Sequence, residues 1–150
     1  MEIETLTELL NISGVKVTEI IKEEENELYL RVEASEEKPA ICSGCESAHE
    51  RVHSMCEVTV EDLRLSEKRV FLVLKKRKVR CPRDEQIHVE KIDWIKERFT
   101  ERFAREINRL TSITTNQEAG WYLGLDDEKV YRIDKKILEE EAKKNGSFVL

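Results

Sequence analysis

Long apolar runs are absent from this sequence of 150 residues. The longest of them, such as residues 70–74, are far shorter than the roughly 20 apolar residues that span a bilayer. The N-terminus, Met1-Glu2-Ile3-Glu4, lacks both the basic start and the continuous apolar stretch of a secretory signal. We therefore expect a cytoplasmic protein with no membrane anchor.

Catalytic patterns are absent as well. The sequence has no His-Glu-x-x-His pattern, and its spacings assemble neither an activated nucleophile nor an acid/base pair. A chain of this length forms one domain or two small modules, which excludes a large multidomain enzyme. We expect a protein without catalytic residues and without a small-molecule substrate.

Basic residues are a minority, 26 against 32 acidic residues, so the net charge is −6. That balance alone argues against a nucleic-acid partner, because phosphate binding depends on lysine and arginine. However, residues 1–63 carry 5 basic and 16 acidic side chains, whereas residues 64–150 carry 21 and 16. Residues 68–83 hold eight basic side chains and no acidic one. This segment is either a strand edge that resists aggregation by repulsion or a phosphate-binding patch.

Apolar periodicity separates a β-rich first part from a helical second part. A short amphipathic helix is predicted over residues 2–11, before Gly14. Five β-rich segments follow it, at residues 15–21, 28–32, 51–53, 58–60 and 69–79. The first two of these segments form a hairpin around the charged residues 22–27. No internal repeat is evident.

From residue 95 onward the apolar period becomes that of a helix. One stripe on the helical wheel contains Ile95, Phe99, Phe103, Ile107, Leu110 and Ile113. A row of arginines flanks this stripe, namely Arg98, Arg102, Arg105 and Arg109. The row either follows a phosphate backbone or is an exposed face that is neutralised by pairs such as Glu101 with Arg105.

Residues 115–133 have the proportions of a helix-turn-helix, with Ala119 suited to close helix contact and Gly124 to the turn. In the last helix one side is apolar, at Val130, Ile133 and Ile137. The other side presents the candidate groove-facing residues Tyr131, Arg132, Lys135 and Lys136. Acidic residues at 126–128 suit helix capping. A generic helical hairpin is the alternative interpretation.

Four cysteines and three histidines suggest a metal site. Disulfides are improbable in the cytosol, and Cys42-x-x-Cys45 is the turn that directs two thiolates towards one tetrahedral metal. Cys81 begins a second half-site, but Asp84 stands where a complete zinc ribbon has its fourth cysteine. The expected role is structural zinc, because a catalytic zinc keeps a position open for water.

The fourth ligand is left open by the sequence. His88 is the better zinc ligand by chemistry, Asp84 has the better spacing, and His49 or His53 follows the first cysteine pair. The predicted ligand set is Cys42, Cys45 and Cys81 with His88, or with Asp84 in its place. The alternative is a site that has lost its metal and keeps its cysteines as small buried side chains.

These patterns predict an α+β fold, with a β-rich zinc-ribbon-like module over residues 1–91 and a helical helix-turn-helix module over residues 92–150. Together they resemble the N-terminal region of transposases of the ISL-three insertion-sequence family, over about residues 9–140. The resemblance is carried by residues 14–17, Cys42-x-x-Cys45, residues 51–53, residues 61–63, the basic strand that ends at Cys81-Pro82, and the helix-turn-helix.

The resemblance implies a zinc-binding module that acts with the helix-turn-helix to recognise terminal inverted repeats of double-stranded DNA. In full-length members of the family a ribonuclease-H-like catalytic domain follows, and this chain ends before such a domain. The predicted DNA-binding residues are Lys75, Lys76, Arg77, Lys78, Arg80, the four arginines of the helical row, and the four groove-facing residues of the last helix.

The alternative function is a protein-interaction or dimerisation module that has lost DNA binding. In that case the acidic first part meets a basic partner or a second copy of the chain. Trp94, Trp121 and Tyr122 are candidate anchors for such a contact. In helices, however, aromatic residues of this kind more often belong to the core.

Overall fold

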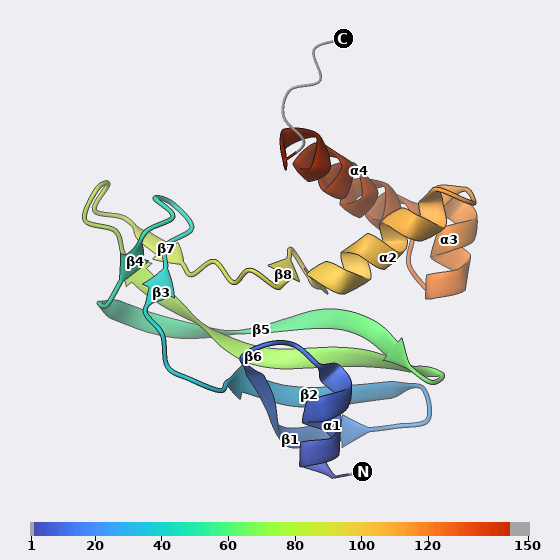
Figure 1. Ribbon diagram of the computed structural model, residues 1–150, viewed down its shortest axis with the longest axis horizontal. Coiled ribbons are helices and arrows are strands. Elements are labelled where there is room, and N and C mark those ends of the chain that lie inside the picture. The colour runs from blue at the N-terminus through green and yellow to red at the C-terminus, as the bar shows by residue number, and fades with distance from the viewer. Residues whose placement is uncertain (1, 145–150) are drawn as a thin grey trace.

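The computed structural model describes residues 2–144, in which strands occupy the first two-thirds of the chain and helices the last third (Figure 1). The predicted α+β class is confirmed. The predicted division into one module over residues 1–91 and another over residues 92–150 stays a prediction. Residues 145–150 of the second module lie outside the described range. In chain order the elements are α1 (Ile3–Leu10), β1 (Val15–Glu23), β2 (Glu27–Ala34), β3 (Ala40–Ile41), β4 (Ala48–His49), β5 (Val52–Leu65), β6 (Lys68–Arg80), β7 (Ile87–Val89), β8 (Ile95–Lys96), β9 (Phe99–Thr100), α2 (Glu101–Thr111), α3 (Asn116–Leu123) and α4 (Asp127–Lys144).

A seven-stranded sheet has the order β1-β2-β6-β5-β9-β8, with β7 paired to the end of β6. Its longest strands, β5 with 14 residues and β6 with 13, form one antiparallel hairpin that runs the length of the molecule (Figure 1). The two short strands predicted over residues 51–60 are therefore parts of one continuous strand. The acidic β1–β2 hairpin lies along the opposite side of this ribbon from the helices α2 to α4, so it does not cover them.

The first core lies between α1 and one face of the sheet. Leu28, Leu30 and Val32 alternate along β2 and are each at most 3% exposed, as expected of a strand with one buried face. Leu6 and Leu10 of α1 cover this face, and the predicted short amphipathic helix is confirmed. The first core ends at Leu74, so the rest of β6 extends beyond α1 as a ribbon.

The second core joins the three C-terminal helices. Phe103, Ile107, Val130, Ile133 and Ile137 are each at most 1% exposed, and they pack in one cluster. The predicted apolar side is thus confirmed for α2 at Phe103 and Ile107, and for α4 at Val130, Ile133 and Ile137. Among residues 2–144 we find no helix with the length and apolar character needed to cross a bilayer.

The helix predicted to start at Ile95 is wrong for its first six residues. The helix begins at Glu101 because Thr100 caps it, accepting a hydrogen bond from the Phe103 amide on its side-chain oxygen. Ile95 and Phe99 are buried as strand residues, and Glu97 turns the chain between them with φ 56°. Ile113, at the other end of the predicted stripe, is 82% exposed.

The turn between α3 and α4 depends on two glycines. Gly124 ends α3 in the left-handed conformation with φ 72°, and the Leu125 amide donates to the Gly120 carbonyl at 2.9 Å. A Cβ atom on Gly120 would lie 2.5 Å from the carbonyl oxygen of Leu125. The close return of the chain over α3 therefore requires glycine at position 120.

Gly120→Ala is expected to destabilise the three-helix unit by about 1–3 kcal/mol, because the new methyl group must displace backbone. Thermal unfolding followed by circular dichroism measures this change. Gln117→Ala, at an exposed position of the same helix, is the matched control and should be close to neutral. Equal melting temperatures for the two variants would contradict the close approach described here.

Candidate metal centre and nucleic-acid interface

The first cysteine pair lies in a tight turn between β3 and β4. The Cys42 amide donates to the Ser47 carbonyl at 2.9 Å, and the Glu46 amide donates to the Cys42 carbonyl at 2.8 Å. Glu46 has φ 58°, which turns the chain back after Cys45. We call this turn, residues 42–47, the first knuckle. Its geometry directs the side chains of Cys42 and Cys45 to one side.

A second turn with the same backbone bonds follows β6. The Cys81 amide donates to the Gln86 carbonyl at 2.8 Å, the Glu85 amide donates to the Cys81 carbonyl at 2.8 Å, and Glu85 has φ 59°. We call residues 81–86 the second knuckle. Asp84 occupies in it the position that Cys45 has in the first knuckle. The replacement of the fourth cysteine therefore leaves the backbone of the knuckle intact.

Backbone pairing and one buried ion pair hold the two knuckles together. Cys42 bridges to Glu90, and the Lys91 amide donates to the Ile41 carbonyl at 2.7 Å. The Glu90 carboxylate accepts from the Arg77 guanidinium at 3.0 and 3.1 Å, and Arg77 also donates to the Lys38 carbonyl. Arg77, predicted to contact DNA, is thus half-buried and engaged by Glu90 and Lys38, two residues that flank the cysteine cluster in the sequence.

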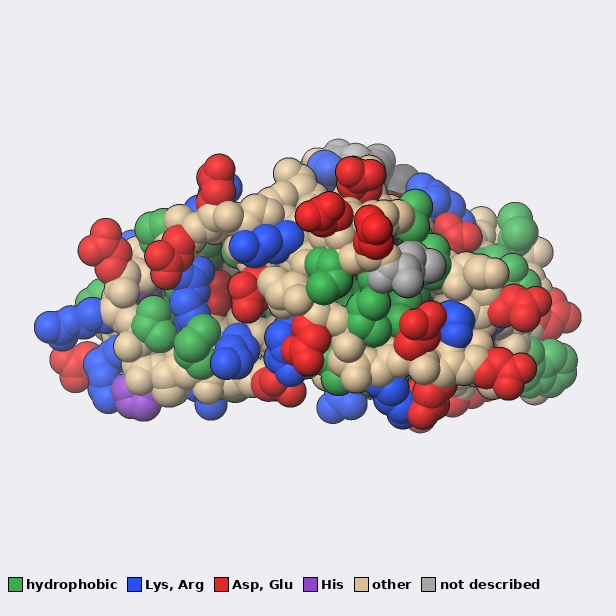
Figure 2. All heavy atoms as spheres, turned by 90° about the horizontal axis from the view of Figure 1, so that it is seen from below, with side chains coloured by type: hydrophobic (Ala, Val, Ile, Leu, Met, Phe, Trp, Pro, Cys, Tyr) green, Lys and Arg blue, Asp and Glu red, His purple; other side chains and the backbone are tan. Residues whose placement is uncertain are grey.

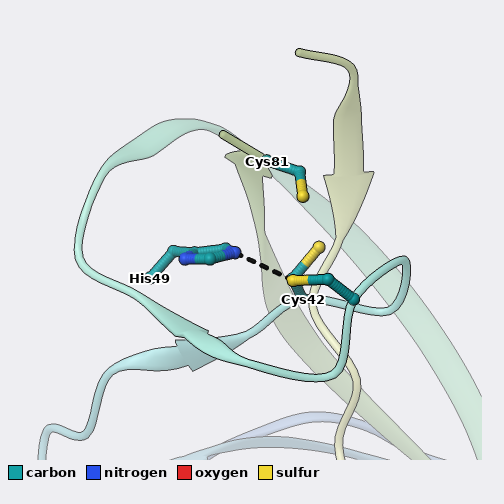
Figure 3. A group of neighbouring side chains, drawn as sticks. Cys42, His49 and Cys81 are labelled. Atoms are coloured by element: carbon teal, nitrogen blue, oxygen red, sulfur yellow. Dashed lines mark hydrogen bonds between the residues drawn. The ribbon is translucent and has the colours of Figure 1, made fainter. Parts of the chain in front are cut away.

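The two knuckles bring together one group of metal-ligating side chains. The ligand atoms of Cys42, Cys45, His49 and Cys81 all lie within 4.8 Å of one another. Cys42 and Cys81 are at most 1% exposed, and Figure 3 shows both of them together with His49 directed into one space. All four cysteines of the chain are free thiols.

This donor set fits zinc. Tetrahedral zinc has Zn–S distances of about 2.3 Å and Zn–N distances of about 2.0–2.1 Å, which places the ligand atoms roughly 3.5–3.8 Å apart. The Cys45 sulfur already lies 3.1 Å from His49 Nε2, so only small adjustments are needed for both atoms to reach a shared ion. Three thiolates and an imidazole would fill all four tetrahedral positions, which is typical of a structural site rather than a catalytic one.

His49, rather than His88 or Asp84, is the fourth member of this group. His49 ends β4, whose pairing with β3 turns its ring towards the cysteines. His88 Nε2 instead lies 2.6 Å from Asp84 Oδ2. The His53 ring is bonded to the adjacent Ser54 hydroxyl. Which residue binds the metal as fourth ligand stays a prediction, and the geometry favours His49.

Asp84 is held as a carboxylate by its own turn. The backbone amide of Gln86 donates to it at 2.8 Å and the His88 ring approaches it at 2.6 Å, and in that order these contacts lower the pKa of Asp84 below its usual value. The Cys81 thiol makes a smaller contribution in the same direction. The second knuckle therefore carries an ionised carboxylate next to the cysteine group.

Basic side chains of β6 leave the core as a row on one face of the ribbon. Lys76, Lys78 and Arg80 occupy alternate positions of β6, about 6.7 Å apart. They lie on the same face of the strand as Leu72 and Leu74, which precede them in the sequence and belong to the first core. None of the three forms an ion pair within the described part of the chain, and the β5 residues opposite the two lysines are the uncharged Cys56 and Ser54. Lys75 lies on the other face, opposite Glu57. We call Lys76, Lys78 and Arg80 the basic row. Figure 2, which views the molecule from the side of β1, shows lysine and arginine gathered towards the end that carries the knuckles, with acidic side chains among them.

The predicted arginine row of the helical part is divided by the structure. Arg102 is bound by Asp62, a carboxylate 1% exposed, and also donates to the Leu10 carbonyl. Arg105 pairs with Glu101 and Glu141, and Arg109 pairs with Glu106 while its side chain stays 75% exposed. Arg98 precedes the helix and is exposed. One member of the row, Arg102, therefore connects α2 to the sheet.

The groove-facing residues predicted for α4 are all on its outer side. Tyr131 is 55% exposed, and Lys135 is exposed without an ion pair in the described chain. Arg132 and Lys136 both pair with Glu97, at 3.2 and 3.6 Å. Asp126 caps the helix by accepting from the Lys129 amide at 2.8 Å, which confirms the capping role predicted for the acidic start.

Comparison with known protein families gives a match that covers the cysteines of this site. Residues 38–84, which contain both cysteine half-sites, match the family model described as the zinc-finger of transposase IS204/IS1001/IS1096/IS1165. No curated protein and no solved structure matches the chain. The zinc-finger part of the predicted resemblance is therefore confirmed, and the chain carries a structural zinc site of the kind found in these transposases.

Proposed function

We propose that this chain is a zinc-stabilised module that binds double-stranded DNA and recognises the terminal inverted repeats of a mobile element. One observation carries the proposal most directly: the basic row lies within the matched residues 38–84, on the strand that ends at the zinc ligand Cys81. Zinc therefore fixes the end of the strand from which these cations project. Phosphate contacts from such a row set the position of a duplex without reading its sequence.

The helix-turn-helix supplies the part of the interface that reads sequence. Tyr131 and Lys135 project from the outer side of α4 towards a major groove. Arg132 and Lys136 share the exposed carboxylate of Glu97, and an exposed ion pair contributes only about 0–1 kcal/mol. Arg132 and Lys136 can therefore leave Glu97 and bind a DNA phosphate with only a small loss of free energy. In this proposal residues 1–91 form the zinc-binding module and residues 92–150 form the helix-turn-helix module.

Replacing Lys76, Lys78 and Arg80 by glutamine is expected to reduce the slope of log K against log salt by about 3, since each lost phosphate contact removes about 0.9 from it. Fluorescence anisotropy with a labelled duplex at several salt concentrations measures the slope. Lys16→Gln is the control, because Lys16 is exposed on the edge strand β1, which β2 separates from β6. An unchanged slope in the triple variant would rule out the basic row as the phosphate contact.

A second candidate function is favoured by two exposed aromatic side chains. Trp121 is 73% and Tyr122 is 70% exposed on α3, contrary to the expectation that helical aromatics belong to the core, whereas Trp94 packs against the first core. A Trp-Tyr pair at the surface is typical of a protein contact, including one between two copies of the chain. Analytical ultracentrifugation of the chain and of its Trp121→Ala variant tests a homodimer.

A further inference from the structure

The two knuckles repeat each other in side chains as well as in backbone. Both carry potential ligands at the same three positions, i, i+3 and i+7: Cys42, Cys45 and His49 in the first, and Cys81, Asp84 and His88 in the second. Glutamate with positive φ stands at i+4 in each of them. The two knuckles therefore carry six potential donors, of which four form the cluster and two, Asp84 and His88, do not.

In both knuckles the third donor folds back on the second. His49 Nε2 lies 3.1 Å from the Cys45 sulfur, and His88 Nε2 lies 2.6 Å from Asp84 Oδ2. Each imidazole thus contacts the second donor of its own knuckle. Only the first of them is inside the four-residue cluster.

His88 is next to that cluster. Its ring atoms lie 2.7–2.9 Å from where a Cβ atom on Gly44 would stand, and Gly44 separates Cys42 from Cys45. The ring therefore lies directly on the backbone of the first knuckle. Glycine at position 44 is what allows this approach, since any side chain there would collide with the imidazole.

We propose that His88 is a reserve zinc ligand, held by Asp84, which takes the fourth coordination position when His49 leaves it. This inference rests on the zinc site described above and adds a second state of it. Imidazole replaces imidazole, so the charge of the ligand set is conserved, whereas entry of the Asp84 carboxylate would add a fourth negative charge. As His88 binds through Nε2, it gives up the proton on that atom and His49 gains one, so the exchange is balanced.

The exchange would leave the metal in place while it frees β4. His49 is the last residue of β4, and its bond to the metal ties the segment before β5 to the knuckles. With His88 as ligand, the second knuckle still holds Cys81 at the end of the basic strand. Zinc would then be retained through a movement of residues 48–52, next to the basic row.

Cobalt(II), whose tetrahedral thiolate complexes absorb visible light, tests the proposal on the full chain. We expect His49→Ala to bind one cobalt per chain with a tetrahedral spectrum and an affinity reduced roughly tenfold, and His88→Ala to bind like the unsubstituted protein. The double variant should lose a further factor of at least about 10. His53→Ala, which removes an imidazole outside the cluster, is the matched control.

Three outcomes overturn the inference. If His49→Ala binds cobalt as weakly as the double variant, no reserve ligand exists; His49→Gln repeats this test in case alanine disturbs β4. If His88→Ala weakens binding as much as His49→Ala, His88 is a permanent ligand. If the unsubstituted chain binds no cobalt, the zinc site itself is refuted, and its DNA affinity, measured separately, shows whether the proposed function fails with it.

Discussion

Cys42→Ser is expected to release the zinc ion and to unfold both knuckles, the largest effect of any single substitution considered for this chain. Cys42 is fully buried and lies in the four-residue cluster, so serine removes one of its three thiolates and leaves only two soft sulfur ligands for zinc. Structural zinc in small domains contributes an apparent binding free energy of about 10–16 kcal/mol, and in such sites binding free energy is folding free energy. Metal content by mass spectrometry and amide exchange in residues 40–50 measure the two losses.

Cys56→Ser is the matched control for this prediction. Cys56 is a half-buried thiol on β5, opposite Lys76, and lies outside the metal cluster. The Cys56→Ser variant should keep one zinc ion per chain, and its backbone amides should keep their native protection from hydrogen exchange. One zinc ion per chain in both variants would show that Cys42 is not a ligand.

Arg102→Ala is expected to destabilise the chain by about 3–5 kcal/mol, because it leaves the buried Asp62 carboxylate without its cation. Asp62 accepts from Arg102 Nε at 2.8 Å and from the Thr100 hydroxyl at 2.7 Å, and Arg102 also reaches the Leu10 carbonyl. This cluster connects α2 to β5 and to the end of α1. Denaturant unfolding gives the free energy difference between the variant and the unsubstituted chain.

Arg109→Ala provides the comparison within the same predicted arginine row. Its side chain is 75% exposed and, among residues 2–144, its guanidinium pairs with Glu106 alone, so its removal should change the free energy of unfolding by about 0–1 kcal/mol. If both variants lost the same small amount of stability, the Asp62 pair would not be the connection between sheet and helices that its burial indicates.

Periodicity predicted most of the elements, because alternation and helical spacing reflect burial directly. Its failure at residues 95–100 has a physical cause: Ile95 and Phe99 are spaced four apart, which suits a helix and also suits two strands joined by a turn at Glu97. The cap at Thr100 was the signal that could have located the true start of α2.

The cysteines of the metal site could be found from their spacing, but its fourth member could not. His49 and His88 stand at the same distance from their knuckle cysteines, seven residues, so spacing alone gives them equal rank. The choice between them depends on β3–β4 pairing, which consists of two residue pairs and leaves little trace in the sequence. Glu90 and Asp62 were missed for a related reason, since an isolated carboxylate shows its partner only after folding.

Duplex binding by the zinc-loaded chain tests the central claim most directly. Anisotropy of a labelled duplex carrying the inverted repeat, titrated at 50 mM and 200 mM salt, should show a complex that weakens by at least about tenfold between the two concentrations, because several phosphate contacts release counterions. The zinc-depleted chain, measured alongside, should bind more weakly. Absence of a complex at 50 mM salt, with zinc bound and the fold intact, would contradict the account.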